Sequence, residues 1–297
     1  LRRYPVGEVV GFQGIGEGVE NTNYFVDTED GRWVLTLFER LDHDDLPFFL
    51  GLMEHLATHG FPSAAPLHTS DGRSLVSLNG RPAALVRRLT GQSVLFPSIA
   101  QCRATGEVLG ELHRIAASFD GSAVNTRGER WRRQTAASLR PKLDADTRAL
   151  IDDELATQEA LDPAALPQGI VHADLFRDNV LFVDERLSGV IDFYYACTDS
   201  LLYDLAVTVN DWCFDPHGTL NAARAGAMIQ AYQGRRQTTV AEQAAWNLTL
   251  RAAALRFYLS RLYDWHHPRE GGMVHVKDPD AYRCILEFHR TQPLNLD

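Results

Sequence analysis

The first 90 residues alternate apolar and polar positions in a way that predicts antiparallel β-strands. Two segments rich in β-forming residues, Tyr24–Val26 and Trp33–Phe38, flank a turn that contains Asp30-Gly31, and this arrangement predicts a hairpin. Asn79-Gly80 predicts a second tight turn. The strands on either side of it are expected at Ser74–Leu78 and Ala83–Leu89.

Apolar residues that recur about every 3.6 positions predict the helices. In the first region, Asp45–Gly60 has this spacing and ends at Gly60-Phe-Pro62, where glycine and proline stop a helix. Beyond residue 90 the helical pattern dominates the chain. Helices are expected at Ser98–Ala117, Thr135–Leu161, Leu201–Cys213, Leu220–Tyr232 and Ala241–Tyr263.

One β-rich segment, Gly169–Phe193, interrupts the helical region. Thr90-Gly91 is the expected boundary between a sheet region and a helical region. The pattern therefore predicts an α+β fold with two lobes, a small antiparallel-sheet N-lobe (residues 1–90) and a larger, mainly helical C-lobe (residues 91–297).

The β-rich segment also holds the most specific chemical pattern of the chain. His172-Ala-Asp174-Leu-Phe-Arg-Asp-Asn179 separates two strands, and Asp192 ends the next one. A hairpin between those strands would bring Asp192 back beside Asn179. Magnesium takes oxygen ligands and only one or two of them from protein, so Asn179 and Asp192 suit a metal site. Asp174 can face a substrate hydroxyl, and phosphoryl transfer needs this combination and little covalent chemistry.

Simpler roles exist for the same residues. A lone aspartate and asparagine in a polar loop often only cap turns. The strands and the Ile-Asp-Phe ending that follow make the functional interpretation more specific. His172 could bind a metal, but we expect it to pack and hydrogen-bond so that it supports the loop.

The stretch resembles the catalytic and metal-binding loops of the aminoglycoside phosphotransferase and choline kinase group, relatives of the protein kinases. The resemblance implies a bilobal protein-kinase-like fold. It implies Asp174 as the catalytic base, and Asn179 and Asp192 as ligands of Mg²⁺ bound with ATP. The N-lobe would cover the nucleotide, and the C-lobe would carry the catalytic loop and the substrate-binding helices.

Further family-specific segments are Gly14–Val26, Trp33–Glu39, Asp45–Phe49, His172–Phe182 and Leu202–Cys213. Together they resemble the homoserine kinases of this fold type, over a region from about Gly11 to Leu262. This resemblance implies ATP-dependent phosphorylation of the L-homoserine hydroxyl to O-phospho-L-homoserine, a step of threonine biosynthesis.

Nucleotide binding is expected near the N-terminus. Glycines at 14, 16 and 18 precede a strand and could cover phosphates with backbone N–H groups, although glycine clusters also make ordinary turns. Protein kinases place a lysine on the third strand, but Thr36 stands at the equivalent position and no lysine precedes Lys142. A hinge-like strand near Leu89 would bind adenine through its backbone. The expected nucleotide-binding residues are Gly14, Gly16, Gly18, Asn21, Thr36, Arg87 and Leu89.

Homoserine is a zwitterion, so its recognition needs an anion for the ammonium group and a cation for the carboxylate. Asp211 and Arg261 are the expected partners, while Asp174 would contact the hydroxyl. Arg256, five residues earlier on the same late helix, is a further candidate for the carboxylate. Each arginine could instead form a structural salt bridge, and for Arg256 the salt bridge is slightly favoured. Asp204 is expected to support the catalytic loop.

Charge and composition limit the kinds of molecule that the protein is expected to bind. A net charge of −10 disfavours nucleic acid. No run approaches the roughly 18 apolar residues of a membrane helix, and the first residues lack the apolar segment of a secretory signal. The four cysteines are widely spread, which predicts reduced thiols and a cytoplasmic location. ATP and L-homoserine are the expected partners of a monomer or homodimer.

Three other functions stay open from sequence. The same chemistry could act on another small alcohol, such as choline, an aminosugar or methylthioribose. A catalytically weak, pseudokinase-like module would explain the absent lysine. A metal-dependent hydrolase built on His172 and Asp174 would release phosphate without an acceptor.

Overall fold

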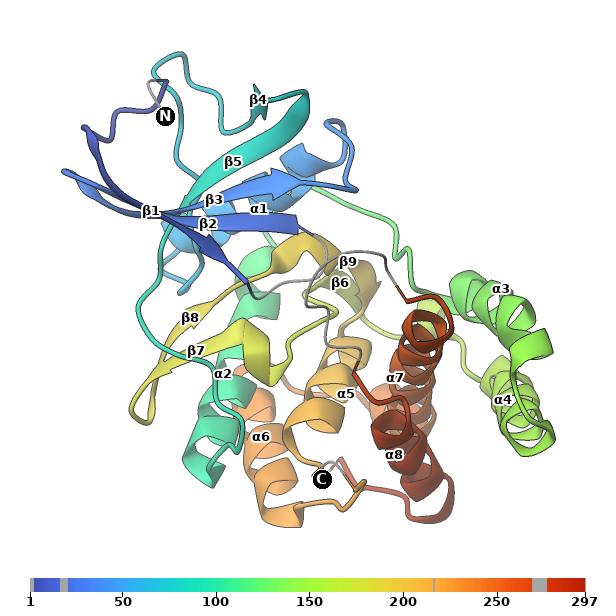
Figure 1. Ribbon diagram of the computed structural model, residues 1–297. Helices are drawn as coiled ribbons and strands as arrows, with labels where there is room; N and C mark the ends of the chain where they lie inside the picture. The colour runs from blue at the N-terminus through green and yellow to red at the C-terminus, as the bar shows by residue number, and fades with distance from the viewer. Residues whose placement is uncertain (1–2, 17–20, 216, 269–276, 297) are drawn as a thin grey trace. The chain divides into compact units, whose positions relative to one another are not determined.

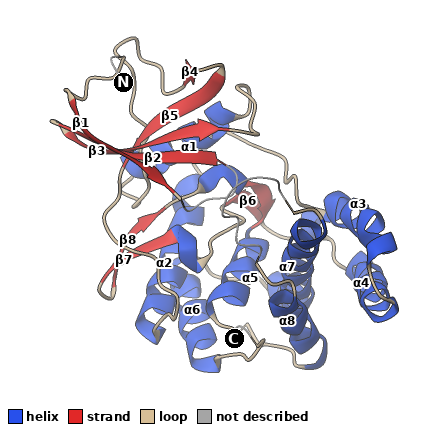
Figure 2. Cartoon of the chain, viewed as in Figure 1, coloured by secondary structure: helices blue, strands red, loops and turns tan. Residues whose placement is uncertain are grey.

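The computed structural model describes residues 3–16, 21–215, 217–268 and 277–296 (Figures 1 and 2). The chain divides into two compact units. The first comprises Leu1–Ser93, Ser118–Gly121 and Val180–Tyr194; the second comprises Val94–Ala117, Ser122–Asn179 and Tyr195–Asp297. The predicted α+β class is confirmed. Residues 180–194 group with the first unit although they follow residue 90, and the functions predicted for the two lobes stay predictions.

The first unit contains an antiparallel sheet in the order β1-β2-β3-β5-β4. Thr28 pairs with Gly31, so the first hairpin turns within the predicted connection. Leu78 pairs with Arg81 across Asn79 and Gly80, whose φ values of 51° and 79° match the turn expected from Asn-Gly. The strands are β1 (Val9–Ile15), β2 (Asn21–Thr28), β3 (Gly31–Phe38), β4 (Val76–Leu78) and β5 (Arg81–Arg87).

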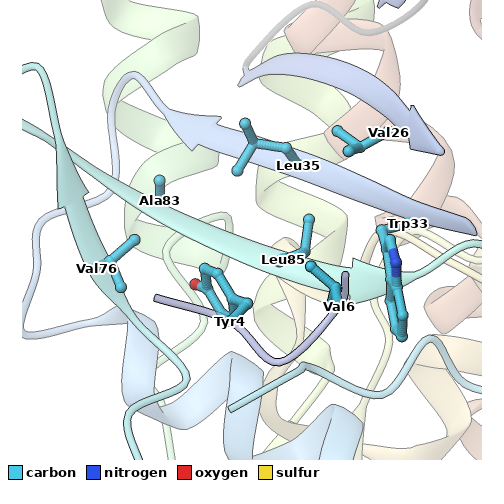
Figure 3. Close-up of a cluster of buried hydrophobic side chains, with 8 residues drawn as sticks. All are labelled: Tyr4, Val6, Val26, Trp33, Leu35, Val76, Ala83 and Leu85. Atoms are coloured by element: carbon cyan, nitrogen blue, oxygen red, sulfur yellow. The ribbon is translucent and has the colours of Figure 1, made fainter. Parts of the chain in front are cut away.

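Alternate residues of the central strands build one hydrophobic cluster of this unit. Trp33 and Leu35 come from β3, and Ala83 and Leu85 come from the neighbouring β5 (Figure 3). The Trp33 indole donates to Thr28 Oγ1 at 3.1 Å, which satisfies its one polar atom. The cluster is completed by Tyr4, Val6, Val26 and Val76.

Helix α1 (Leu46–Thr58) confirms the helix predicted at Asp45–Gly60. Its apolar stripe at 3.6-residue spacing is buried, as an amphipathic helix requires. The buried residues are Leu46, Phe49, Leu50, Leu52, Met53 and Leu56.

The hairpin of β7 (Val180–Val183) and β8 (Arg186–Val190) is joined to the segment that follows β5. Gln92 and Phe182 exchange two backbone hydrogen bonds of 2.9 Å, and Ser188 Oγ donates to Thr90 O at 2.6 Å. Gly91 lies between these contacts with a φ of 125°, and a Cβ there would lie 2.9 Å from Phe182 O. Only glycine therefore fits at this position.

The second unit is mainly helical (Figure 2). The helices predicted at 98–117, 201–213, 220–232 and 241–263 are confirmed within a few residues at each end. In the described ranges, no helix combines the length and apolarity of a bilayer-crossing segment. The helices are α2 (Ile99–Ala116), α3 (Glu129–Leu139), α4 (Ala145–Thr157), α5 (Leu201–Trp212), α6 (Ala222–Arg235), α7 (Val240–His266) and α8 (Asp280–Thr291).

The single helix predicted at Thr135–Leu161 is wrong. Helix α3 ends at Leu139, and α4 starts at Ala145. Pro141 cannot continue an α-helix because it lacks the backbone N–H. Asp144 then caps the new helix by accepting from Thr147 N at 2.8 Å.

In the second unit, helices α2 and α6 pack closely against each other (Figure 1). Gly106 and Gly110 lie one turn apart on α2 and face α6. A Cβ on Gly110 would lie 3.0 Å from Tyr232 O, and a Cβ on Gly106 would overlap the Met228 carbonyl. The two glycines therefore let the helix backbones approach more closely than any larger residue would.

Helix α8 packs beside α7 and inserts a fully buried histidine (Figure 1). His289 Nε2 donates to Asn210 Oδ1 at 2.8 Å, since the Asn210 amide nitrogen itself donates to Leu250 O at 2.9 Å. Among the described residues, the buried His289 Nδ1 has no hydrogen-bond partner. Burial lowers the pKa of His289 to about 4, so the fold favours the neutral ring.

We expect His289 to make the protein sensitive to mild acid. A histidine whose folded pKa is lowered contributes stability above its unfolded pKa, near 6.5, and loses it as the pH falls toward the folded value. The free energy of unfolding should fall by about 3 kcal/mol between pH 7 and pH 4 from this residue. Urea titrations at several pH values should show a smaller fall in His289→Gln. The exposed His217→Gln is the control and should keep the wild-type slope; an unchanged slope in His289→Gln would contradict the assignment.

Candidate active site

The loop between β6 (Gln168–Val171) and β7 closes on itself through Asp174 and Asn179. Asp174 O accepts from Phe176 N at 2.7 Å and from Asn179 Nδ2 at 2.8 Å. Asn179 Nδ2 also lies 3.2 Å from Asp174 Oδ2. The amide nitrogen of Asn179 is thus directed into the loop, which leaves its oxygen, Oδ1, available to a ligand.

A buried carboxylate holds the start of this loop. Asp204, on α5, is fully buried and accepts from His172 N at 2.7 Å and from Ala173 N at 2.8 Å. Its Oδ2 also lies 3.0 Å from His113 Nε2. Ala173 has a φ of 62°, a left-handed conformation that costs about 1–2 kcal/mol for a residue with a Cβ. The two backbone hydrogen bonds hold it there.

The charge of Asp204 is stabilised by these donors. Burial alone would raise the pKa of its carboxyl, but the hydrogen bond and charge of His113 and the backbone N–H of His172 together hold the pKa below its usual range. The carboxylate is therefore ionised wherever the fold is intact at neutral pH. The contacts of Asp204 are those of a residue that holds the loop in place, and the supporting role predicted for the His172 side chain stays a prediction.

The same face of α5 holds the rest of the loop. Asp211 Oδ2 accepts from Arg177 N at 2.8 Å and Arg177 Nε at 3.1 Å. Trp212 Nε1 donates to Leu175 O at 3.0 Å. These two residues follow Asp204 by seven and eight positions, which is two helical turns, so all three side chains lie on one face. Sequence analysis did not assign Trp212 or His113 to the loop, and it gave Asp211 a substrate role that stays a prediction.

Asp192 lies two residues beyond the end of β8. Val190 pairs with Val180, so the hairpin that the sequence predicted between these two strands is present, while a metal site at Asn179 and Asp192 stays a prediction. The Asp192 side chain is exposed, and its φ of 64° is left-handed. Burial, with the charge of Asp192, raises the pKa of Tyr194, which keeps the neighbouring phenol neutral.

Four of the predicted nucleotide-binding residues, Gly14, Asn21, Thr36 and Arg87, lie in strands of the first unit. Gly14 is in β1 opposite Tyr24, and Gly16 follows β1 with open space where a Cβ would stand. Gly18 lies outside the described residues. Asn21 opens β2, and the buried Thr36 of β3 donates to Asn23 Oδ1 at 2.8 Å.

Arg87 and Leu89 stand at and just beyond the end of β5. The Arg87 side chain is exposed, while its backbone N–H donates to Ala65 O at 3.0 Å. Leu89 packs on Gly189, where an added Cβ would lie 2.7 Å from Leu89 Cδ1. Arg261, predicted for the substrate carboxylate, donates to Asp278 O at 2.9 Å in the second unit.

Within the described ranges, no three His, Cys, Asp or Glu side chains gather as a metal cluster. The predicted metal ligands are of another kind: Asn179, in the second unit, carries an amide oxygen, and Asp192, in the first unit, carries a carboxylate. Hard oxygen donors of this type fit Mg²⁺, which draws most of its ligands from water and phosphate. Asn179 Nδ2 donates to the loop, so Oδ1 is the amide atom that would bind the metal.

Comparison with known proteins identifies the family. A model described as "Phosphotransferase enzyme family" matches residues 11–238. The chain belongs to this family. It is 48% identical over 287 residues to a homoserine kinase of Methylobacillus flagellatus, covering 97% of this chain and 90% of the relative. It is 43% identical over 297 residues to a homoserine kinase of a Janthinobacterium species, covering 98% of this chain and 92% of the relative. These findings confirm the resemblance inferred from the motifs.

Solved phosphotransferase structures share the fold. Amicoumacin kinase hAmiN, in complex with AMP-PNP and Ca²⁺, matches with a TM-score of 0.71 at 13% identity, over 97% of this chain and 89% of that one. A microcompartment-associated aminopropanol kinase matches with a TM-score of 0.69 at 18% identity, over 97% and 92%. At these identities the similarity shows the fold alone, and it confirms the predicted kinase-like architecture.

Proposed function

We propose that this phosphotransferase transfers the γ-phosphoryl group of ATP to the hydroxyl of L-homoserine. The products are O-phospho-L-homoserine and ADP, which assigns the enzyme to threonine biosynthesis. The observation that carries the choice of acceptor is near-full-length similarity to proteins named homoserine kinase, at 43–48% identity. The cytoplasmic location and the monomeric or homodimeric state stay predictions.

Asp174 is the proposed base. Its carboxylate accepts a hydrogen bond from the substrate hydroxyl and takes the proton as that oxygen attacks the γ-phosphorus. The new O–P bond forms while the bond from phosphorus to the β,γ-bridging oxygen breaks, and ADP leaves with that electron pair. Asn179 Nδ2 donates to the Asp174 backbone carbonyl at 2.8 Å and lies 3.2 Å from Asp174 Oδ2, contacts that would help to orient the carboxylate.

Asn179 and Asp192 are the proposed metal ligands. Mg²⁺ bound with the nucleotide would neutralise charge on the phosphates. The backbone near Gly14 and Gly16 would cover those phosphates, and the backbone near Leu89 would bind adenine. The use of nucleotide by structural relatives that bind AMP-PNP with Ca²⁺ or ADP supports this arrangement.

We expect Asp192→Asn to weaken the metal site. Asparagine tolerates the left-handed φ of 64° at this position, so the substitution removes charge with little backbone strain. The Mg²⁺ concentration for half-maximal rate should rise by at least about tenfold, because a carboxylate ligand is lost. The measurement is ADP release against Mg²⁺ at fixed ATP.

The matched control is Asp178→Asn, which removes the same charge from an exposed residue paired with Lys277 at 2.8 Å. It should leave the Mg²⁺ dependence unchanged. Equal Mg²⁺ curves for wild type and Asp192→Asn would exclude Asp192 as a ligand.

The substrate proposal is tested by ADP release with a panel of alcohols. L-homoserine should exceed choline, an aminoglycoside and methylthioribose by at least about tenfold in kcat/KM. A higher kcat/KM for one of the other alcohols would reassign the acceptor. ADP release that is independent of any alcohol would instead favour a hydrolase.

A further inference from the structure

Arg256, on α7, is a buried cation that forms no ion pair with the carboxylates of the described residues. Its side chain is 4% exposed, and its Nε has no hydrogen-bond partner among the described residues. The guanidinium lies 3.7 Å from the ring centroid of Phe257 and 5.3 Å from that of Tyr195. The salt bridge predicted for Arg256 from sequence is absent within the described ranges, where aromatic rings surround the guanidinium instead.

A second arginine of the same unit is also buried and only partly hydrogen-bonded. Arg132, on α3, is 7% exposed, and its Nε also lacks a hydrogen-bond partner among the residues described. Asp199 is near enough to act on it electrostatically, but that carboxylate accepts from Asn125 Nδ2 at 2.5 Å and from Ser200 N at 2.6 Å. Burial lowers the pKa of Arg132 despite these neighbours.

Both arginines lie near the start of α5, the helix that holds the catalytic loop. Both act electrostatically on the buried Tyr203, the residue that directly precedes the loop-holding Asp204 on α5. Phe257, beside Arg256, has its ring centroid 4.5 Å from that of Phe176, two residues after Asp174. Both cations therefore lie in the same unit as the proposed base, and Arg256 is connected to its loop through Phe257.

Keeping a guanidinium buried without an anion is unfavourable. A protein that retains such groups therefore gains stability when an anion binds to them. Arginine also binds carboxylates with two parallel hydrogen bonds, which fixes their orientation.

We propose that Arg256, assisted by Arg132, binds the α-carboxylate of the amino-acid substrate. This inference rests on the proposed function. It assigns to Arg256 the carboxylate-binding role that the sequence predicted for Arg261. Arg261 is partly exposed, donates to the Asp278 carbonyl and stacks on Tyr282 at 4.5 Å. A pocket of this kind would select acceptors with a carboxylate and reject neutral amino alcohols.

The test compares L-homoserine with L-homoserinamide, in which a neutral carboxamide replaces the carboxylate. Wild type should prefer L-homoserine by about 100-fold in kcat/KM, because the amide leaves the cations unpaired. Arg256→Gln should lose about 100-fold in kcat/KM for L-homoserine, mainly through KM, and change less than about threefold for the amide. Arg261→Gln is the control and should keep the wild-type preference.

The outcomes separate this inference from the proposed function. Wild type that uses the amide as well as the acid overturns the carboxylate site without any variant, even if Arg256→Gln does not fold. An Arg256→Gln enzyme that keeps its preference, or an Arg261→Gln enzyme that loses it, also overturns the assignment. Wild type that phosphorylates another alcohol and ignores both compounds refutes the function itself.

Discussion

Replacing Asp174 with Asn should lower kcat by about 1000-fold, within the range expected when a general base is removed. Asparagine keeps the size of the side chain but cannot take the hydroxyl proton. The contact that shapes the loop is made by Asn179 to the Asp174 backbone carbonyl, at 2.8 Å, and it persists in the variant. The KM for ATP should therefore stay within about threefold, since the substitution acts on proton transfer and not on nucleotide binding.

ADP release at saturating ATP and L-homoserine measures this effect. Asp178→Asn, four residues away in the same loop and exposed, is the control and should retain most of its rate. An Asp174→Asn enzyme with more than a tenth of the wild-type kcat would rule out Asp174 as the base.

Asp204→Asn should destabilise the protein by about 3–5 kcal/mol, because it breaks a fully buried charged network. The carboxylate accepts from His172 N, Ala173 N and His113 Nε2 through two oxygens. Asparagine offers one oxygen, so its amide nitrogen would face a donor. Urea unfolding at pH 7 measures the loss.

The exposed Asp152→Asn, which breaks the surface pair with Arg140 at 2.7 Å, is the control and should change stability by less than about 1 kcal/mol. A lowered carboxyl pKa contributes stability above the unfolded value, near 4, and loses it as the pH falls toward the folded value. The variant should therefore lack part of the wild-type acid sensitivity below about pH 4. An Asp204→Asn protein as stable as wild type would show that the network does not support the loop.

The fold was predictable where short-range signals set it. The hairpin turns at 27–32 and 79–80 follow from their turn residues. Helix α2 begins as its capping residues dictate, with Ser98 Oγ accepting from Gln101 N at 3.1 Å and the Gln101 side chain accepting from Ser98 N at 2.9 Å. Pro141 and Asp144 are short-range signals of the same kind, since proline ends a helix and aspartate caps the next one. This break between α3 and α4 was not predicted because the helical spacing of apolar residues continues across it.

Long-range pairing was not predictable in the same way. Strand β9 (Cys197–Ser200) is short and half polar, and it exists because it pairs with Gln168–Val171. Helix α8 was not predicted, although Tyr282, Ile285, Leu286 and His289 have helical spacing and are buried. His289 interrupts the apolar pattern of this helix in the sequence. Its burial is explained by the hydrogen bond with Asn210, which the sequence does not show.

The residues of the candidate site show the same contrast between local and long-range contacts. Asp174 and Asn179 were identifiable because they lie five residues apart in one loop, and their contacts are local. The partners of an arginine depend on residues distant in sequence. The sequence favoured Arg261 for the substrate, whereas burial and the aromatic surroundings that distinguish Arg256 come from Tyr195, Phe257 and the packing of α7.

The central claim is that one phosphoryl group passes from ATP to the homoserine side-chain oxygen. Phosphorus NMR of a reaction with ATP, Mg²⁺ and L-homoserine tests it most directly. The account predicts one phosphomonoester on the side-chain oxygen for each ADP formed, and no excess inorganic phosphate. ADP accompanied by inorganic phosphate, with homoserine unmodified, would contradict it.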